Sequence, residues 1–182
     1  MASGRSHDRA TTVLALPFGL LWGPALGWPG VATAALFFLV GGLWLSPDLD
    51  TRSRATARWG PLALLWWPYR RLLSHRSLIS HSPLLGTAVR LGWLAALLLL
   101  GSALLAPLGS PSPAQLLAWA GGLAGSRAPL LLAALVGLEA STWLHLLQDG
   151  DPIPRLPRLL RLLLRGRPRP GRLGAARRRR RG

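Results

Sequence analysis

The sequence predicts an all-α, polytopic membrane protein with about four transmembrane helices, of which the first two are short. Half of the 182 residues are hydrophobic and gather in long runs, although the formal net charge is +16. A soluble nucleic-acid-binding protein rarely carries such runs, whereas a membrane protein with basic cytosolic segments combines both properties. The chain has no Cys, which excludes disulfides and thiolate metal sites.

Four apolar runs mark the expected helices, at residues 10–28, 31–45, 83–106 and 129–147. A membrane-spanning helix needs about 20 mainly apolar residues, and the third and fourth runs meet this requirement. The first two runs are short and share a tight turn at residues 27–30. We therefore expect them to form a thin helical hairpin that crosses the membrane fully or in part.

The arginines predict the orientation of these helices. All 22 basic residues are Arg, and twenty of them precede the first run, lie between the second and third, or follow the fourth. The loop of residues 107–128 contains only Arg127, and Arg90 lies inside the third run. Because basic loops stay in the cytosol, both termini are expected there, with loop 107–128 on the opposite face.

Two further segments border the expected helices. Between the second and third runs, the stretch WWPYRRLL places aromatic residues beside Arg, which favours a position along the membrane surface. After the fourth run, RLPRLLRLLLR carries Arg on one helical face, and from Gly166 onward Gly, Pro and Arg predict disorder. We therefore divide the chain into a helical membrane domain, residues 1–152, and a basic tail, residues 153–182.

The basic tail suggests anionic lipid headgroups as its partner, because a basic amphipathic helix directly follows a membrane helix. Nucleic acid is the less favoured partner, since no aromatic platform or folded reader accompanies the Arg runs. A third interpretation is that the tail only fixes the topology and binds nothing.

The histidines and acidic residues gather at one end of the expected bundle. Nine of the ten flank the apolar runs on the cytosolic side, and only Glu139 lies deeper. Imidazole and carboxylate without thiolate suit one or two divalent ions, with zinc favoured and manganese or iron(II) as alternatives. The predicted metal ligands are His7, Asp48, Asp50, His75, His81, His145 and Asp149.

Local spacing supports several of these ligands. His145 and Asp149 are four residues apart, so both project from one face of a helix, as ligands to a shared ion must. Asp48 and Asp50 are separated by one residue and can present two carboxylates to one ion or bridge two. The alternative is that this pair only neutralises the two arginines that follow it.

The residues around His81 predict how it is held. Ser82 and Pro83 follow it, as expected of an N-cap and the first residue of the third helix, which would keep His81 at the membrane rim. A histidine near a membrane interface can also be only an amphipathic surface residue. Asp151 is interpreted as a turn residue.

Three further charged residues are candidates for roles near the predicted ligands. Asp8 is either a helix cap or a residue that touches the ion or its ligands. Glu139 and Arg90 lie at similar depth, so a buried ion pair and a role at the metal site are equally favoured for Glu139. Arg76 is the candidate for binding a substrate phosphate.

Five blocks of the chain resemble a family of uncharacterised metal-binding membrane proteins known mainly from cyanobacteria: GRSHDR, GGLWLSPDLDTRSR, WGPL with WWPYR, HRSLISHSPLLGT and LHLLQDG. The resemblance covers about residues 3–152 and implies a bacterial inner, plasma or thylakoid membrane. That family resembles the inner-membrane-associated metal-dependent hydrolases, which share a Pro-Asp-x-Asp block, a His-Arg…His-Ser block and a later His. The matching residues here are Pro47, Asp48, Asp50, His75, Arg76, His81, Ser82 and His145.

A more distant similarity is to a group of all-helical zinc phospholipases and nucleases that use His-x-x-x-Asp/Glu pairs. Only His145 and Asp149 match that pattern, and the second pair of the group is missing here.

Three functions are compatible with these features. The first is a membrane-bound metal-dependent hydrolase of a phosphoester or lipid headgroup at the cytosolic surface, with one or two ions as the cofactor. The second is a non-catalytic scaffold in which the ion holds helix ends together. Transport is less favoured, because transporter ligands lie near the bilayer midplane and these lie at the rim.

Overall fold

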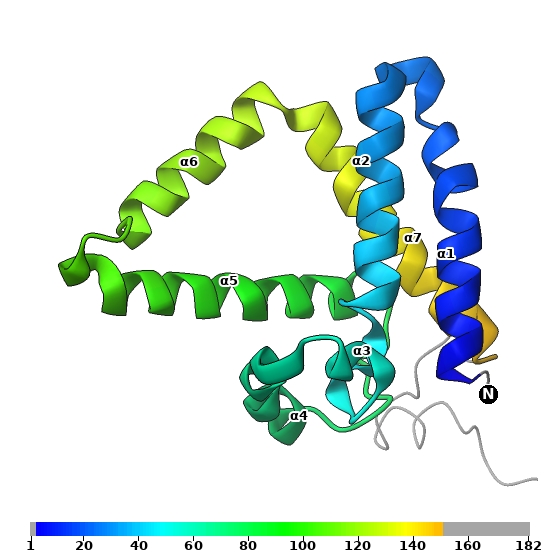
Figure 1. Cartoon of the computed structure of the whole chain (residues 1–182), viewed down its shortest axis with the longest axis horizontal. Coiled ribbons are helices and arrows are strands. Elements are labelled where there is room, and N and C mark those ends of the chain that lie inside the picture. The colour runs from blue at the N-terminus through cyan, green and yellow to red at the C-terminus, as the bar shows by residue number, and fades with distance from the viewer. Residues whose placement is uncertain (1–2, 151–182) are drawn as a thin grey trace, which may run out of the picture.

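The computed structural model describes residues 3–150, and within these residues the regular structure is entirely helical (Figure 1). The elements are α1 (Gly4–Leu20), α2 (Gly23–Leu43), η1 (Pro47–Asp50), α3 (Arg54–Ala57), η2 (Gly60–Trp66), α4 (Trp67–Leu72), α5 (Leu85–Leu105), η3 (Ala106–Leu108), α6 (Pro113–Ser126) and α7 (Ala128–Gln148), where η marks a 3-10 helix. The all-α prediction is confirmed for this part of the chain. The basic tail and Asp151 lie outside the described residues.

Helices α1 and α2 form the N-terminal hairpin, with boundaries that differ from those expected. Helix α1 begins ahead of the first apolar run, because the Ser3 side chain accepts a hydrogen bond from the Ser6 amide at 3.2 Å. The chain reverses close to the turn expected at residues 27–30, at a kink inside α2 where Gly27 has φ 60°, because Gly23 meets Val31 and Gly19 meets Ala35 across the hairpin. A proline in the first turn lets α2 begin before this kink, since that position needs no amide hydrogen bond.

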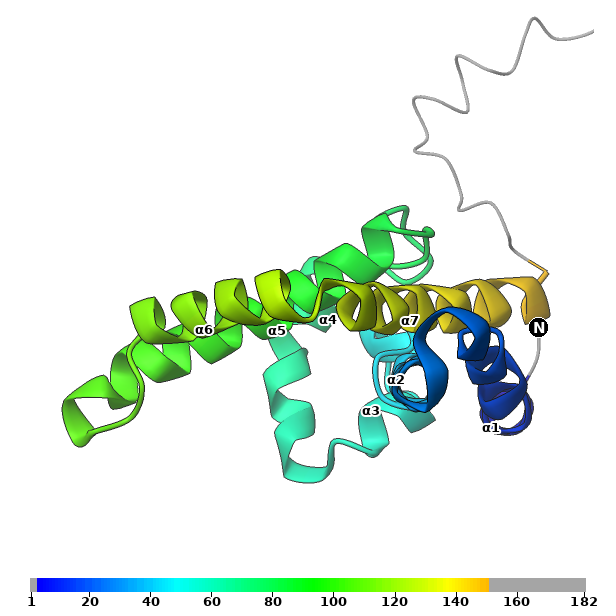
Figure 2. The ribbon, with the colours of Figure 1, turned by 90° about the horizontal axis from the view of Figure 1, so that it is seen from above.

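Helix α2 packs against both α1 and α7 to make a three-helix bundle (Figures 1 and 2). Glycines bring the backbones of α2 and α7 close together. A Cβ added to Gly41 would collide with Ser141 Oγ, and one added to Gly137 would lie 2.7 Å from the carbonyl oxygen of Ala34. Small residues at such contacts are typical of helices that pack within a membrane. The contacts fix how the C-terminal ends of α2 and α7 meet.

The connection between α2 and α5 buries some of its large apolar side chains and exposes others. Trp66 and Tyr69 are fully or almost fully buried and pack in a core with Leu49. Trp67 and Leu72 are exposed, so only one face of η2 and α4 has the character expected from WWPYRRLL. The hydrophobic side chains on the other face anchor the connection beneath the bundle.

The start of α5 differs from the prediction. Ser82 and Pro83 do not cap the helix, which begins at Leu85 after a residue with φ 59°, Leu84. The amide of Leu84 donates to Glu139 Oε1 of α7 at 2.8 Å, and this contact takes the place of a local side-chain cap. A long-range contact therefore determines where α5 begins, and local sequence signals do not encode such a contact.

Helices α5 and α6 form an arm beside the bundle. In Figure 1, α5 runs crosswise to α2, and α6 returns from its far end to the start of α7. No residue of α6 is buried, and few residues of α5 are. The arm therefore exposes apolar surface along most of its length.

Three helical segments are long and apolar enough to cross a membrane: Gly23–Asp50, Leu85–Leu108 and Ala128–Gln148. Helix α1, with 17 residues, is not among them. The structure thus supports three candidate spans, while the fourth span and the orientation remain predictions.

Candidate metal centre

The structure brings all seven predicted ligands together at one end of the bundle. They come from the first turns of α1, from η1, from the loop before α5 and from the end of α7. Their ligand atoms form three groups, each with all atoms within 4.8 Å of one another: Asp48, His81 and His145; His7, His145 and Asp149; Asp50, His75 and His81. We call the first of these the central group, because it shares a residue with each of the others.

The 3-10 turn η1 sends its two carboxylates in different directions. Ser46 caps the turn by accepting a hydrogen bond from the Asp48 amide at 3.4 Å, and Pro47 occupies the first position. A 3-10 helix has about three residues per turn, so residues two apart cannot share a face. Asp48 faces His145, whereas Asp50 faces His75.

The central group has the spacing of metal ligands and not of hydrogen-bonded partners. Asp48 Oδ1 lies 3.5 Å from His145 Nε2 and 3.7 Å from His81 Nε2. Both distances exceed those of ordinary hydrogen bonds. Within residues 3–150, neither buried Nε2 atom has a hydrogen-bond partner. Since buried polar atoms are nearly always satisfied, these two nitrogens are available to a partner such as a metal ion.

His7 joins α1 to the end of α7. Its ring stacks on His145 with centroids 4.0 Å apart, its Nδ1 lies 2.8 Å from Gln148 Oε1, and its Nε2 lies 3.2 Å from Asp149 Oδ1. The other oxygen of Asp149 lies 3.8 Å from His145 Nε2 and accepts a hydrogen bond from Arg76 Nη2 at 3.1 Å. Arg76, the predicted phosphate-binding candidate, is thus engaged with a carboxylate of the site.

Asp50 holds two histidines at once. Its Oδ1 lies 2.9 Å from His75 Nδ1, and its Oδ2 lies 3.2 Å from His81 Nδ1, which is also 3.0 Å from Ser80 Oγ. His81 therefore turns Nδ1 towards Asp50 and Nε2 towards the central group. A carboxylate that orients an imidazole in this way is common behind metal-binding histidines.

The charges around His81 affect its protonation. Burial by itself lowers the pKa of His81, but the carboxylates of Asp48 and Asp50 outweigh burial and raise the pKa above its ordinary value. A divalent cation at the central group would compensate the same two negative charges that the proton on His81 compensates.

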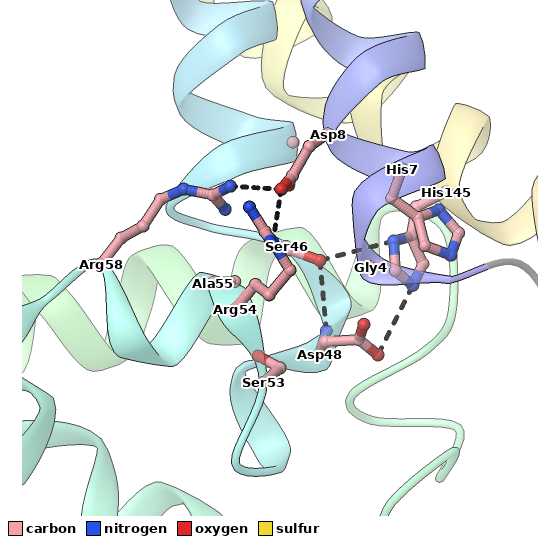
Figure 3. A pocket seen from close by; sticks show the side chains of 11 residues that line it. Gly4, His7, Asp8, Ser46, Asp48, Ser53, Arg54, Ala55, Arg58 and His145 are labelled. Carbon is pink, nitrogen blue, oxygen red and sulfur yellow. Dashed lines mark hydrogen bonds and ion pairs between the residues drawn. The ribbon is translucent and has the colours of Figure 1, made fainter.

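Asp8 lies outside the three groups of ligand atoms. Its Oδ2 accepts a hydrogen bond from Arg54 Nε at 2.7 Å and forms an ion pair with Arg58 (Figure 3). Its carboxylate is therefore directed to α3 and not to the histidines.

Glu139 also lies outside these groups, and the predicted ion pair with Arg90 is not formed among the described residues. Glu139 Oε1 accepts from the Leu84 amide. The Arg90 guanidinium, which is buried, donates to Thr142 Oγ1 at 2.8 Å and to the Ser80 carbonyl at 3.1 Å. Arg90 is therefore hydrogen-bonded to neutral acceptors. Through the Ser80 carbonyl it holds the loop that carries His81.

Three polar residues at the site were not singled out from the sequence. Ser46 Oγ lies 3.4 Å from His145 Nδ1, Ser80 contacts His81, and Gln148 contacts His7. Each one is next to a ligand motif, which is the signal that could have identified it.

A cavity of about 210 Å³ opens beside the central group (Figure 3). His7, Asp48 and His145 line it on one side, and Arg54 and Arg58 line it on the other. The site is therefore accessible from outside the bundle although its histidines are largely buried.

Comparison with known proteins agrees with this arrangement. No match was found among curated proteins or among solved structures. Residues 2–155 match a family described as "Uncharacterized metal-binding protein (DUF2227)". The matched region contains all the histidines and carboxylates of the site. Because the match covers most of the chain, this protein belongs to the DUF2227 family of uncharacterized metal-binding proteins.

Proposed function

We propose that the chain is an integral membrane protein that holds one divalent transition metal, preferably zinc, at the central group. The observation that carries this proposal is the pair of buried, unpartnered Nε2 atoms of His81 and His145 facing Asp48 Oδ1. Asp149 Oδ2 lies 3.8 Å from His145 Nε2, on the side of His145 that faces His7.

The distances within the central group fit a small tetrahedral site. Zinc lies about 2.0–2.1 Å from nitrogen and oxygen ligands, so two ligands of one tetrahedral ion are about 3.3–3.4 Å apart. The observed 3.5 and 3.7 Å are slightly longer, and small side-chain movements would close the difference. Calcium and magnesium are less suitable, because they prefer oxygen ligands.

The membrane part of the proposal is supported by the three long apolar helices and by the arginines. Two of the three candidate spans, those containing α2 and α7, end at the metal site. The excess of Arg on the same side favours a cytosolic location for this end of the bundle.

The preferred activity is hydrolysis of a phosphoester, including that of a lipid headgroup. A divalent ion in such a site supplies Lewis-acid chemistry, stabilising charge on a phosphoryl oxygen and making hydroxide available near neutral pH. The chain contributes the cavity beside the central group, in which Asp48 and His145 are accessible to a substrate. A closed structural site would lack such an opening.

A non-catalytic scaffold is the second candidate, because the central group joins three separate parts of the fold. Asp48 follows α2, His81 precedes α5, and His145 ends α7. An ion bound by all three would hold these segments together and contribute to folding.

Elemental analysis of the purified, detergent-solubilised protein tests the metal site. We expect one zinc ion per wild-type chain and less than a tenth of that content in Asp48→Asn and His145→Gln. Asp8→Asn is the matched control, because Asp8 lies at the same end of the bundle but outside the three groups, and it should retain the ion.

Equal metal content in all four proteins would refute the site. Two ions per chain would instead favour a dinuclear centre. Hydrolysis of a chromogenic phosphate ester by the zinc-loaded wild type, lost in His145→Gln, would separate the hydrolase from the scaffold. A zinc-dependent rise in unfolding temperature without hydrolysis would support the scaffold.

A further inference from the structure

The cavity beside the central group has one wall that the metal site does not explain. This wall is formed by Arg54 and Arg58, which come from α3 and the residue after it. Figure 3 shows both side chains directed towards Asp8, across the cavity from His7 and His145. The predicted phosphate-binding residue, Arg76, does not line this cavity.

The two arginines are held in place differently. Arg58 Nη1 donates to the Leu43 carbonyl at 2.9 Å while its Nη2 pairs with Asp8, so its position is fixed by α2 and α1 together. Arg54 uses Nε to bind Asp8 at 2.7 Å. Within residues 3–150, the two terminal Nη groups of Arg54 donate to no acceptor. Arg54 therefore keeps both Nη groups available as donors on a side chain that Asp8 already orients.

The charges around the cavity favour an anion once a cation is bound. Asp8 compensates one of the two arginine charges, and Asp48 would be compensated by a divalent ion. A partly desolvated cavity with excess positive charge attracts anions, and a guanidinium fork matches the oxygens of a phosphate group. At about 30 Å³ per water molecule, the cavity has room for a tetrahedral oxyanion and a water.

We propose that this cavity binds the phosphate group of a substrate, with Arg54 as its direct ligand and with Arg58 and Asp8 as positioning residues. The inference rests on the proposed metal site, because the bound cation makes the cavity positive. The phosphate can belong to a lipid headgroup or to a soluble phosphate ester, since both present the same oxygens. The roles of Arg54, Arg58 and Asp8 go beyond the metal-binding description of the family.

Calorimetric titration of the zinc-loaded protein with inorganic phosphate tests the proposal. Arg54→Gln should weaken phosphate binding about tenfold or more, as expected for loss of a hydrogen-bonding charge. Arg52→Gln is the matched control, because Arg52 is exposed two residues before Arg54, ahead of α3, and does not line the cavity. Metal-free wild type should bind phosphate at least tenfold more weakly than the zinc-loaded protein.

Zinc content measured on the same samples separates this inference from the proposed function. If all variants hold zinc and Arg54→Gln binds phosphate as tightly as wild type, the phosphate pocket is wrong while the metal site stands. If wild type holds no zinc, the metal site itself fails. If Arg54→Gln loses zinc, Arg54→Lys is used instead, because Lys keeps the positive charge but lacks the paired donors of the guanidinium. Unchanged phosphate affinity in Arg54→Lys would overturn the role of Arg54.

The source of the phosphate is tested with nanodiscs. Zinc-loaded protein in phosphatidylcholine nanodiscs with and without phosphatidic acid is titrated with inorganic phosphate. Competition by phosphatidic acid that disappears in Arg54→Gln would assign the pocket to a lipid phosphomonoester. Unchanged phosphate affinity in the presence of phosphatidic acid would assign it to a soluble phosphate ester.

Discussion

Asp50 shows most clearly how one side chain can serve the site without being placed as a ligand of the central group. Its side chain is fully buried, and its two oxygens contact the Nδ1 atoms of His75 and His81. The sequence alone made Asp50 an equal partner of Asp48, because both belong to one Asp-x-Asp motif. The 3-10 turn separates their roles, since it directs only Asp48 towards His145.

Asp50→Asn should therefore weaken zinc binding about 10–100-fold without abolishing it, as is usual when the partner of a metal-binding histidine is removed. Asn keeps the size of the side chain but loses the charge that orients His81. Zinc affinity is measured by competition with a chelator of known affinity, with Asp8→Asn as the control. If Asp50→Asn lost zinc binding as completely as Asp48→Asn, Asp50 would itself be a ligand, as the sequence predicts.

At this scale the sequence predicts which residues gather but not how they pair. The His and acidic residues flank apolar runs, so their position at one end of a bundle follows from topology. The pairing of Asp8 with Arg54, and of Arg90 with Thr142, depends on the relative rotation of packed helices. No local pattern in a single sequence encodes that rotation.

Among the elements, the contact between α2 and α7 determines the distance between Asp48 and His145. Their backbones approach at Gly41 and Gly137, where any side chain would meet atoms of the opposite helix. The metal site lies directly beyond this contact, so its geometry depends on glycines that are not themselves ligands.

Gly137→Val should push α7 away from α2, at a cost of about 1–3 kcal/mol of stability, and lower zinc affinity at least tenfold. Gly92→Val is the matched control, because a Cβ at Gly92 in α5 would meet no atom within 4 Å. Thermal unfolding and zinc titration of both variants check the expectation. If the two variants bind zinc alike, the α2–α7 contact does not control the site.

The helices themselves were largely predictable, whereas their ends were not. Long apolar runs identify α2, α5 and α7, because few other structures accommodate such runs. The start of α5 depends on Glu139, more than fifty residues away, and α1 and α2 both begin several residues before the apolar runs that predict them. The short helices η1 and α3 have no apolar period and are visible only in the structure.

For the whole molecule, the arm formed by α5 and α6 raises the question of how the chain sits in a membrane. The third apolar run predicts that α5 crosses the bilayer beside the other helices. In Figure 1, however, α5 runs crosswise to α2. Its exposed apolar surface suits lipid in either position, because lipid-facing helices need no protein partner.

Reporter fusions should place both termini in the cytosol and Gln115, at the start of α6, on the opposite side. The twenty arginines outside loop 107–128 and the third run provide the physical reason. Cysteine labelling is a convenient second measurement, because the chain has no Cys of its own. A cytosolic Gln115 would mean that α5 and α6 lie along the cytosolic surface and do not cross.

The order in which the chain is synthesised gives the central group a further property. Asp48 and His81 leave the ribosome well before His145, which lies in the last turn of α7. A growing chain that has inserted only its first hairpin therefore cannot complete the site, whatever the zinc concentration around it. On the proposed function, the ion would be captured only after α7 has been inserted and has packed against α2. A bound ion would thus mark a chain whose helices have assembled in the membrane. Without zinc, fully synthesised chains would lack the ion that joins η1, the loop before α5 and the end of α7.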